Sequence, residues 1–176
     1  MKHIFFILLI SQTMTAQSIY NFNPHSNIND WNIVNDGVMG GLSKGTITIN
    51  EHGHGVFEGK ISLDNNGGFS SVRYAFEQYN IKDYKKVVIK LKGDGKPYQF
   101  RVRPDYRDRY SYITIFETTG EWQEVEINLA DMYPSFRGRK LDMPNFDSAY
   151  LEEVTFLIGN KKEEKFRLLI DSIELQ

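Results

Sequence analysis

Three arginines occupy positions from which a β-strand could present them to a ligand. In the segment PYQFRVR (97–103), apolar and polar residues alternate, so that Arg101 and Arg103 fall on one side of an extended chain and Phe100 on the other. Arg73, at the end of FSSVR, either extends this polar face or braces the glycine-rich turn before it through hydrogen bonds to backbone carbonyls. Guanidinium groups are fixed hydrogen-bond donors, so the three side chains together predict a binding surface for a saccharide or a protein.

Aromatic side chains near these arginines could complete such a surface. Tyr112 in YSYITIF and Trp122 in EWQEVEI offer ring faces that can stack on the apolar faces of sugars. The alternative is structural, with the arginines held in ion pairs by Glu124 and Glu126. The first interpretation predicts an open groove floored by rings, and the second predicts a surface of closed ion pairs.

Other chemistry finds little support in the sequence. His52 and His54 flank a glycine in EHGHG without a third ligand nearby, so no metal site is expected there. Asp36, Asn66 and Asp171 carry oxygen atoms suited to calcium, but the sequence alone does not assign a metal to them. The chain has no cysteine, which excludes disulfides and thiol nucleophiles. No nucleophile elbow and no acid/base pair stands out, so we expect a protein that is not an enzyme and needs no cofactor.

Two glycine-rich runs could be mistaken for phosphate-binding loops. They read NDGVMGGLSKG (35–45) and NNGGFSSVRY (65–74). A phosphate cradle requires GxxxxGK[ST] after a strand or GxGxxG at the start of a helix, and neither pattern occurs. The runs therefore predict tight turns, and we expect Gly67 and Gly68 to connect two strands with at least one positive φ angle.

Charge argues against nucleic acid as a partner. The segment RVRPDYRDRY (101–110) contains four arginines and two tyrosines, but Asp105 and Asp108 offset half of its positive charge. The whole chain has 21 basic and 23 acidic residues, a formal net charge of −2. A protein that binds polyanions is expected to be basic, so no nucleic-acid partner is predicted.

The first residues have the pattern of a secretory signal peptide. MKHIFFILLISQTMTAQS places a lysine before an apolar stretch and a small residue, Ala16, before a polar segment. The apolar stretch is far shorter than the ~20 residues needed to cross a bilayer, so no membrane span is expected. We therefore expect a signal peptide over residues 1–16, one domain over residues 17–176 and a secreted or periplasmic location.

The elements that must position these residues are short strands. After a polar leading segment, extended patterns separated by Asn, Asp and Gly turns occur at 45–49, 55–63, 69–76, 86–92, 97–103, 110–117, 122–129, 152–158 and 165–175. No helical periodicity persists over three turns, and LADMYPSF (129–136) gives one helical turn at most. Many short strands at even spacing predict an all-β fold, an antiparallel β-sandwich or jelly roll.

Several linked motifs resemble those of a known family. NDGVMGGLSKG, FEGKISLDNNGGFSSVR, LKGDGKPYQFRVR, YSYITIF with EWQEVEI, and SFRGRKL occur in this order between about Trp31 and Leu175. Together they are similar to the NADH:ubiquinone oxidoreductase complex I intermediate-associated protein 30 family. The positions that carry the resemblance are Asp36, Met39, Gly40, Gly41, Ser43, Asn66, Gly67, Gly68, Phe69, Arg73, Asp94, Arg137 and Arg139.

The resemblance implies a fold and a class of function. It implies a galactose-binding-like jelly roll, an architecture shared with many carbohydrate-binding modules, and its mitochondrial members are non-catalytic assembly factors for respiratory complex I. With the expected export signal, the leading hypothesis is an exported binding module that holds a saccharide or a protein on one sheet face or its end loops. The alternative is an assembly factor that acts through protein contacts.

Overall fold

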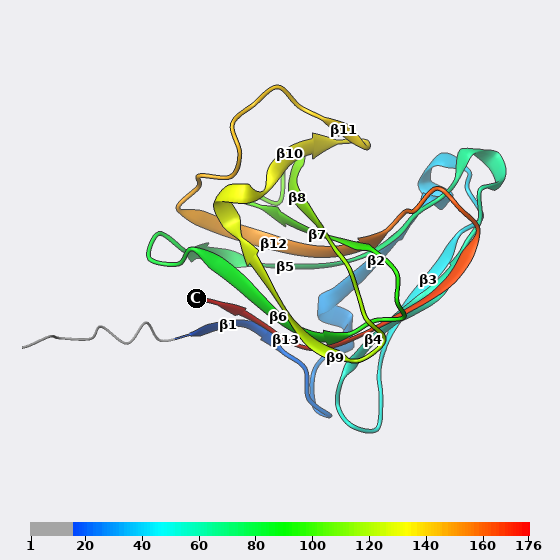
Figure 1. Ribbon diagram of the computed structural model, residues 1–176, viewed down its shortest axis with the longest axis horizontal. Coiled ribbons are helices and arrows are strands. Elements are labelled where there is room, and N and C mark those ends of the chain that lie inside the picture. The colour runs from blue at the N-terminus through cyan, green and yellow to red at the C-terminus, as the bar shows by residue number, and fades with distance from the viewer. Residues whose placement is uncertain (1–15) are drawn as a thin grey trace, which may run out of the picture.

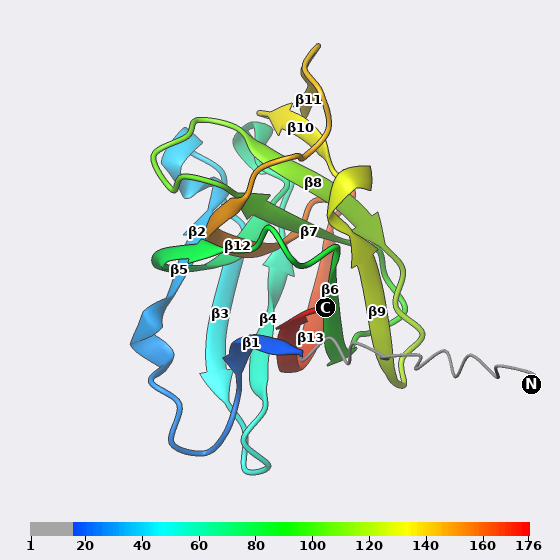
Figure 2. The same cartoon turned by 90° about the vertical axis from the view of Figure 1, so that its left-hand side faces the viewer.

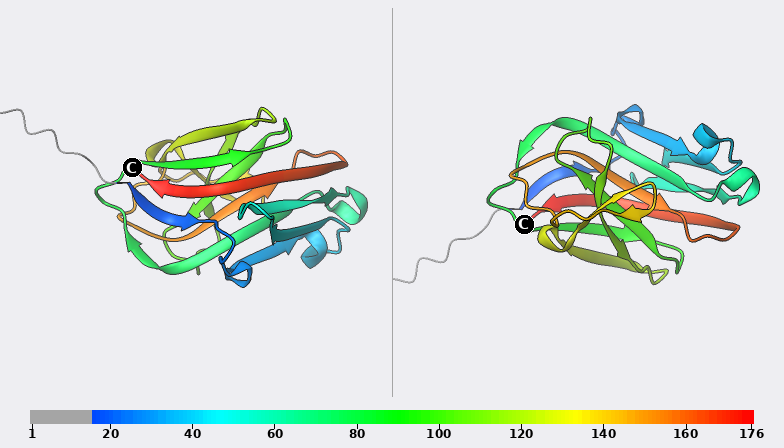
Figure 3. Two further views of the ribbon diagram at one scale, coloured as in Figure 1. Left: turned by 90° about the horizontal axis from the view of Figure 1, so that it is seen from below. Right: turned by 90° about the horizontal axis from the view of Figure 1, so that it is seen from above.

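Two antiparallel β-sheets pack face to face in the computed structural model, which describes residues 16–176 (Figure 1). Figure 1 shows the sheets as two layers, one above the other, and in Figure 3 the red C-terminal strand and the orange strand before it both run along the long direction of the molecule. The all-β prediction, a β-sandwich or jelly roll, is confirmed. No helix in the described part of the chain is long and apolar enough to cross a membrane.

Sheet 1 is built around the long C-terminal strand. Its order is β3 (Lys44–Ile49), β4 (Gly55–Ile61), β13 (Glu164–Leu175), β6 (Lys86–Lys92) and β9 (Trp122–Asn128). β1 (Gln17–Asn21) pairs with the last residues of β13, beyond the part of β13 that β4 occupies. The first described residues and the C-terminus therefore lie side by side (Figure 2).

Sheet 2 carries the predicted arginines. Its order is β11 (Arg139–Lys140), β10 (Tyr133–Phe136), β8 (Ser111–Phe116), β7 (Tyr98–Arg103), β12 (Tyr150–Ile158), β5 (Ser70–Asn80) and β2 (Trp31–Asn35), as Figure 1 shows. Short 3-10 helices at Ile28–Asp30, Asp36–Met39, Asp64–Asn66 and Leu129–Asp131 connect strands of the two sheets.

The core lies between the sheets and is made by one side of each strand. Phe57 and Ile89 from sheet 1 and Phe100 and Phe156 from sheet 2 have no exposed surface. In β7 buried and half-buried residues alternate along the whole strand, as its sequence pattern predicts. Each large apolar side chain buried in this way contributes ~1.5–3 kcal/mol, and packing holds the fold without disulfides.

The predicted strands agree with the structure, and four further strands were missed. All nine expected segments correspond to strands, with ends that differ by a few residues, and the turn in LADMYPSF is the 3-10 helix Leu129–Asp131. The missed strands are β1, β2, β10 and β11, which lie at or near sheet edges. The leading segment, described from the sequence only as polar, forms β1 and buries Phe22 and Trp31 in the core.

Candidate functional site

A buried carboxylate joins the two glycine-rich runs. Asp36 has no exposed surface and accepts hydrogen bonds from the backbone N–H groups of Ser43 (2.9 Å), Gly68 (2.6 Å) and Phe69 (3.3 Å). The hydroxyl group of Ser43 also donates to this carboxylate. The runs are therefore one structural unit, two loops tied together by a shared acceptor.

The glycines are required by this arrangement. A β carbon at Gly67 would lie 2.6 Å from Oδ2 of Asp36, and one at Gly41 would overlap the same side chain. Gly68 has a φ angle of 134°, which confirms the prediction of a positive φ in this turn. Gly41 and Gly67 thus serve the packing around Asp36, and Gly40 and Gly68 supply positive φ angles in the two loops.

The environment of Asp36 favours its charged form. Burial raises the pKa of Asp36, but the hydrogen bonds from Ser43, Gly68 and Phe69 more than offset this and hold the pKa below its ordinary value. Asp36 was considered as a calcium donor, but N–H and O–H donors surround its oxygens. Asp171, another candidate, lies on β13 of sheet 1 in an ion pair with Lys90. Among residues 16–176 there is no group of three or more potential metal ligands.

The three predicted arginines lie together on the outer side of sheet 2. We call Arg73, Arg101 and Arg103 the arginine face. Strand register places Arg73 and Arg101 on either side of Thr155, the central residue between them on β12. Neighbouring strands are about 4.8 Å apart, so the backbones of these two arginines are separated by roughly 10 Å. The full row across the sheet is Asn32, Arg73, Thr155, Arg101, Ile113 and Tyr133.

Arg73 therefore extends the arginine face. The other possibility, that Arg73 donates to carbonyls of the glycine turn, is not supported, because Nε of Arg73 has no hydrogen-bond partner within residues 16–176 and the register places Arg73 beside Thr155. Asn65 adds a second link between the loops, since its side-chain amide donates to the carbonyl of Gly40 at 3.1 Å.

Arg103 is held by a local network. Its Nη1 lies 3.5 Å from Oε2 of Glu153 and donates to the carbonyl of Tyr106 at 3.2 Å, while its Nε donates to the hydroxyl of Ser111 at 3.1 Å. Glu153 is buried and also accepts a hydrogen bond from Thr155 at 3.1 Å. These contacts give Arg103 a structural role, since it neutralises a buried carboxylate.

Arg101 and Arg73 have no comparable partner. Nε and Nη2 of Arg101 both donate to the uncharged side-chain oxygen of Gln99, at 3.1 and 2.6 Å. Nε of Arg73 is buried and has no hydrogen-bond partner. Of the three arginines, only Arg103 forms an ion pair within residues 16–176. The arginine face thus holds three positive groups against one buried carboxylate.

This imbalance is reflected in the protonation equilibria. Burial, followed by repulsion from Arg73 and Arg103, lowers the pKa of Arg101 to about 10. Burial also lowers the pKa of Arg73, although attraction to Glu153 acts in the opposite direction. Both groups remain charged at neutral pH, but their charge is unfavourable in the free protein.

A basic hairpin borders the arginine face. β10 and β11 are joined by Arg137 and Gly138, both with positive φ, and follow β8 at the edge of sheet 2 (Figure 1). Arg137 lies over the ring of Phe136, with 5.4 Å between its Cζ and the ring centroid, and Lys140 lies 5.3 Å from the ring centroid of Tyr133. Exposed Arg139 adds a further positive charge.

The predicted positions of two aromatic side chains, Tyr112 and Trp122, beside the arginines are wrong. Tyr112 points into the core, where its ring contacts Phe146. In the register of β7 and β8, Tyr112 lies opposite Val102 and not opposite Arg101, so the ring and the arginine point to different sides of the sheet. Trp122 lies on β9 of sheet 1, packed against His54 with 4.6 Å between ring centroids. Neither ring reaches the arginine face.

The predicted ion-pair partners are also wrong. Glu126 pairs with Lys86 at 2.8 Å, and Glu124 lies opposite Lys90 in the register of sheet 1. The carboxylate beside the arginines is Glu153, which the sequence analysis missed. Its position was obscured by a β-bulge between Leu151 and Glu153, which breaks the alternation at the start of β12.

Asp94 supports the turn between β6 and β7. Its Oδ1 accepts a hydrogen bond from the hydroxyl of Tyr98 at 3.0 Å, and its Oδ2 accepts from Lys96 at 2.6 Å and from the backbone of Arg167 at 3.0 Å. Burial, together with Asp94, raises the pKa of Tyr98. This family position thus joins the two sheets and lies apart from the arginine face.

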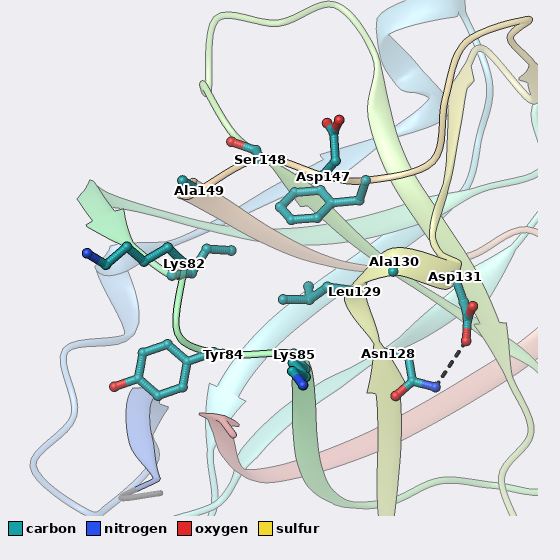
Figure 4. A pocket seen from close by; sticks show the side chains of 12 residues that line it. Lys82, Tyr84, Lys85, Asn128, Leu129, Ala130, Asp131, Asp147, Ser148 and Ala149 are labelled. Carbon is teal, nitrogen blue, oxygen red and sulfur yellow. Dashed lines mark hydrogen bonds between the residues drawn. The ribbon is translucent and has the colours of Figure 1, made fainter.

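A separate pocket opens at one end of the sandwich. It has a volume of about 520 Å³ and lies between the loops near Tyr84, Leu129 and Phe146. In Figure 4, Lys82, Asp131 and Asp147 point in different directions rather than toward a common point. Because ligand sites bring polar groups together, this pocket is a weaker candidate than the arginine face.

The fold and the arginine face define a class of protein, a galactose-binding-like β-sandwich with a polar sheet face. Solved structures agree on the fold. A family 11 carbohydrate-binding module of a cellulosomal cellulase from Clostridium thermocellum has a TM-score of 0.69 and 14% sequence identity, with 93% of this chain and 95% of that module covered. The module in complex with a β-1,3-1,4-mixed-linked tetrasaccharide has a TM-score of 0.67 and 14% identity, with 91% and 94% covered.

Sequence comparison then identifies the family. The model of the complex I intermediate-associated protein 30 family matches residues 20–170, so the chain belongs to that family. One relative is the mitochondrial complex I intermediate-associated protein 30 of Drosophila melanogaster, 24% identical over 196 residues. The match covers 96% of this chain and 66% of the relative's length.

The expected secreted or periplasmic location is wrong, because this named relative is a mitochondrial protein. The signal peptide predicted over residues 1–16 falls, except for Ala16, outside the residues that the structure describes. The predicted family itself is confirmed.

Proposed function

We propose that the chain is a non-catalytic module that binds a protein partner through the arginine face and acts in the assembly of a protein complex. The observation that carries the proposal is that Arg73 and Arg101 lie together on sheet 2 and neither forms an ion pair within residues 16–176. The names of the family and of its relative describe association with a complex I intermediate and no enzymatic activity. They support an assembly role over other kinds of binding.

The chemistry of the face favours protein over saccharide. Sugar-binding surfaces use exposed rings that stack on apolar sugar faces, and the two rings expected for this purpose, Tyr112 and Trp122, lie elsewhere. Arginine is suited to carboxylates, because its planar fork can donate two parallel hydrogen bonds. A protein surface with acidic side chains supplies such acceptors.

The location of the relative removes an objection to this role. An exported protein could not act in the assembly of a mitochondrial complex, but the expectation of export is not supported by a mitochondrial relative. We propose that the partner of this chain is an intermediate in the assembly of a protein complex, because the relative's name describes association with a complex I intermediate.

The experiment is cross-linking and affinity capture from cells that express the tagged full chain. The wild type is compared with Arg101→Gln and with Arg107→Gln as a matched control, because Arg107 is exposed and paired with Asp105. A protein enriched by the wild type and the control, and reduced at least about 10-fold by Arg101→Gln, is expected. Equal capture by all three proteins would contradict the assigned face. Retention on a mixed-linkage β-glucan gel without an enriched protein would favour the saccharide instead.

A further inference from the structure

We propose that Arg73 and Arg101 together bind one carboxylate from an acidic segment of the partner, in the space above Thr155. The inference rests on the proposed function in that the partner is a protein. It adds the chemical group that is recognised and the two side chains that recognise it.

The first argument is the local balance of charge. The outer side of sheet 2 gathers three guanidinium groups, and its buried carboxylate, Glu153, is engaged by Arg103 and Thr155. Arg73 and Arg101 flank Thr155 from opposite sides and have no carboxylate of their own within the described residues. Like-charge pairs of this kind cluster at functional sites, where a ligand of opposite charge would offset their repulsion.

The second argument is an unused donor. Among residues 16–176, Nε of Arg73 is buried and has no acceptor, whereas buried donors are paired in nearly all native structures. This N–H donor therefore lacks an acceptor in the free chain. A carboxylate above Thr155 would supply the missing acceptor and neutralise the charge in the same contact.

The third argument is that Arg101 is already oriented. One oxygen of Gln99 accepts hydrogen bonds from both Nε and Nη2 of Arg101, which fixes the plane of the guanidinium group. A guanidinium group has five N–H donors, so three remain for a ligand. A fixed donor loses little conformational entropy on binding, which favours affinity.

The surroundings favour an acidic segment over a single free anion. Arg137, Arg139 and Lys140 lie on the β10–β11 hairpin at the edge of the same sheet and are exposed. Their charges attract an acidic chain over several ångströms and would hold residues that flank the bound carboxylate. The row of residues from Asn32 to Tyr133, which includes Arg73 and Arg101, crosses the strands of sheet 2, so an extended acidic segment could lie along it.

The test uses the purified full chain and a fluorescent hexaglutamate peptide, with hexaglutamine as the uncharged control and fluorescence anisotropy at low ionic strength as the readout. Hexaglutamate is expected to bind, and hexaglutamine is not. Arg73→Gln and Arg101→Gln are each expected to weaken binding about 10-fold or more, since each removes a charge-assisted hydrogen bond. Arg107→Gln is expected to leave binding unchanged.

A second measurement uses the wild type alone, so it tests the site even where a variant fails to fold. The Nε–H resonance of Arg73 in the wild type is expected to shift on addition of hexaglutamate and to stay in place with hexaglutamine. Inorganic phosphate is titrated in parallel. Tighter binding of phosphate than of hexaglutamate would overturn the carboxylate as the recognised group.

Other outcomes would overturn the site itself. Absence of hexaglutamate binding, or equal binding by the wild type and Arg101→Gln, would exclude it. That failure is distinguishable from failure of the proposed function, because the capture experiment can still yield a protein partner that does not depend on acidic residues.

Discussion

Replacing Arg101 with methionine removes a half-buried charge and retains much of the aliphatic side chain. In the free protein this charge is repelled by Arg73 and Arg103, and its hydrogen bonds go to the uncharged side chain of Gln99. We therefore expect the variant to be more stable than the wild type while it loses the ability to bind an acidic ligand. A binding site often carries such a cost, because groups placed for a ligand are not optimal without it.

The magnitude follows from the protonation equilibrium. The pKa of Arg101 is lowered to about 10, first by burial and then by its two arginine neighbours. One pKa unit corresponds to about 1.4 kcal/mol, so the charged form carries a penalty on the order of 3 kcal/mol. Loss of the hydrogen bonds to Gln99 removes about 1 kcal/mol of stabilisation. The net expectation is a free energy of unfolding higher by about 1–2 kcal/mol, an increase in Tm of about 2–6 °C.

The assay is urea denaturation at pH 7 followed by tryptophan fluorescence, with thermal melts as a second measurement. Arg107→Met is the matched control, because it removes an exposed arginine from the neighbouring loop, and no change in Tm is expected for it. A decrease of more than about 1 kcal/mol for Arg101→Met would refute the reasoning, since it would show that the charge stabilises the free chain.

Three further predictions test the surrounding structure. Arg103→Met should lower the free energy of unfolding by about 2–4 kcal/mol, because it leaves Glu153 buried without its charged partner. This effect has the opposite sign to that of Arg101→Met. A variant more stable than the wild type in urea denaturation would refute the structural role of Arg103. Asp36→Asn should cost about 2–4 kcal/mol at pH 7 because acceptors for buried donors are lost. Because the pKa of Asp36 is lowered in the folded state, its contribution is present above about pH 4 and lost as pH falls, so urea curves from pH 7 to pH 2 should converge for wild type and variant. Gly67→Ala should lower Tm by several degrees and Gly37→Ala should not, because only the first places a β carbon against Asp36. The same Tm for both variants would contradict the packing described around Asp36.

The amino-acid sequence predicts those parts of the structure that depend only on local backbone geometry. The alternation of Phe100 with Arg101 predicts that the arginine lies on the outer side of its sheet, because successive side chains of any strand point to opposite faces. Likewise, Asn and Gly in the run before Phe69 predict a turn with a positive φ angle, which Gly68 has. Both are properties of a few consecutive residues, so no knowledge of distant contacts is needed.

Pairing between distant segments decided what the sequence left open. Arg73 and Arg101 come together only because β5 and β7 both pair with β12, and Glu153 joins them after a bulge that resets its orientation. The sequence correctly places Tyr112 on a strand. Only the pairing of β8 with β7, which sets Tyr112 opposite Val102, shows that its ring faces the core.

The same distinction applies to the glycine-rich runs. Sequence motifs identify them as turns and as a family signature, but their common cause, the carboxylate of Asp36, is visible only once residues 36 and 68 are brought within a hydrogen bond of each other. Which residues of a strand share a face is determined within that strand by the period of the extended backbone. Which groups it then meets is determined by the order and register of strands far apart in the chain, since these follow from the burial of the whole core.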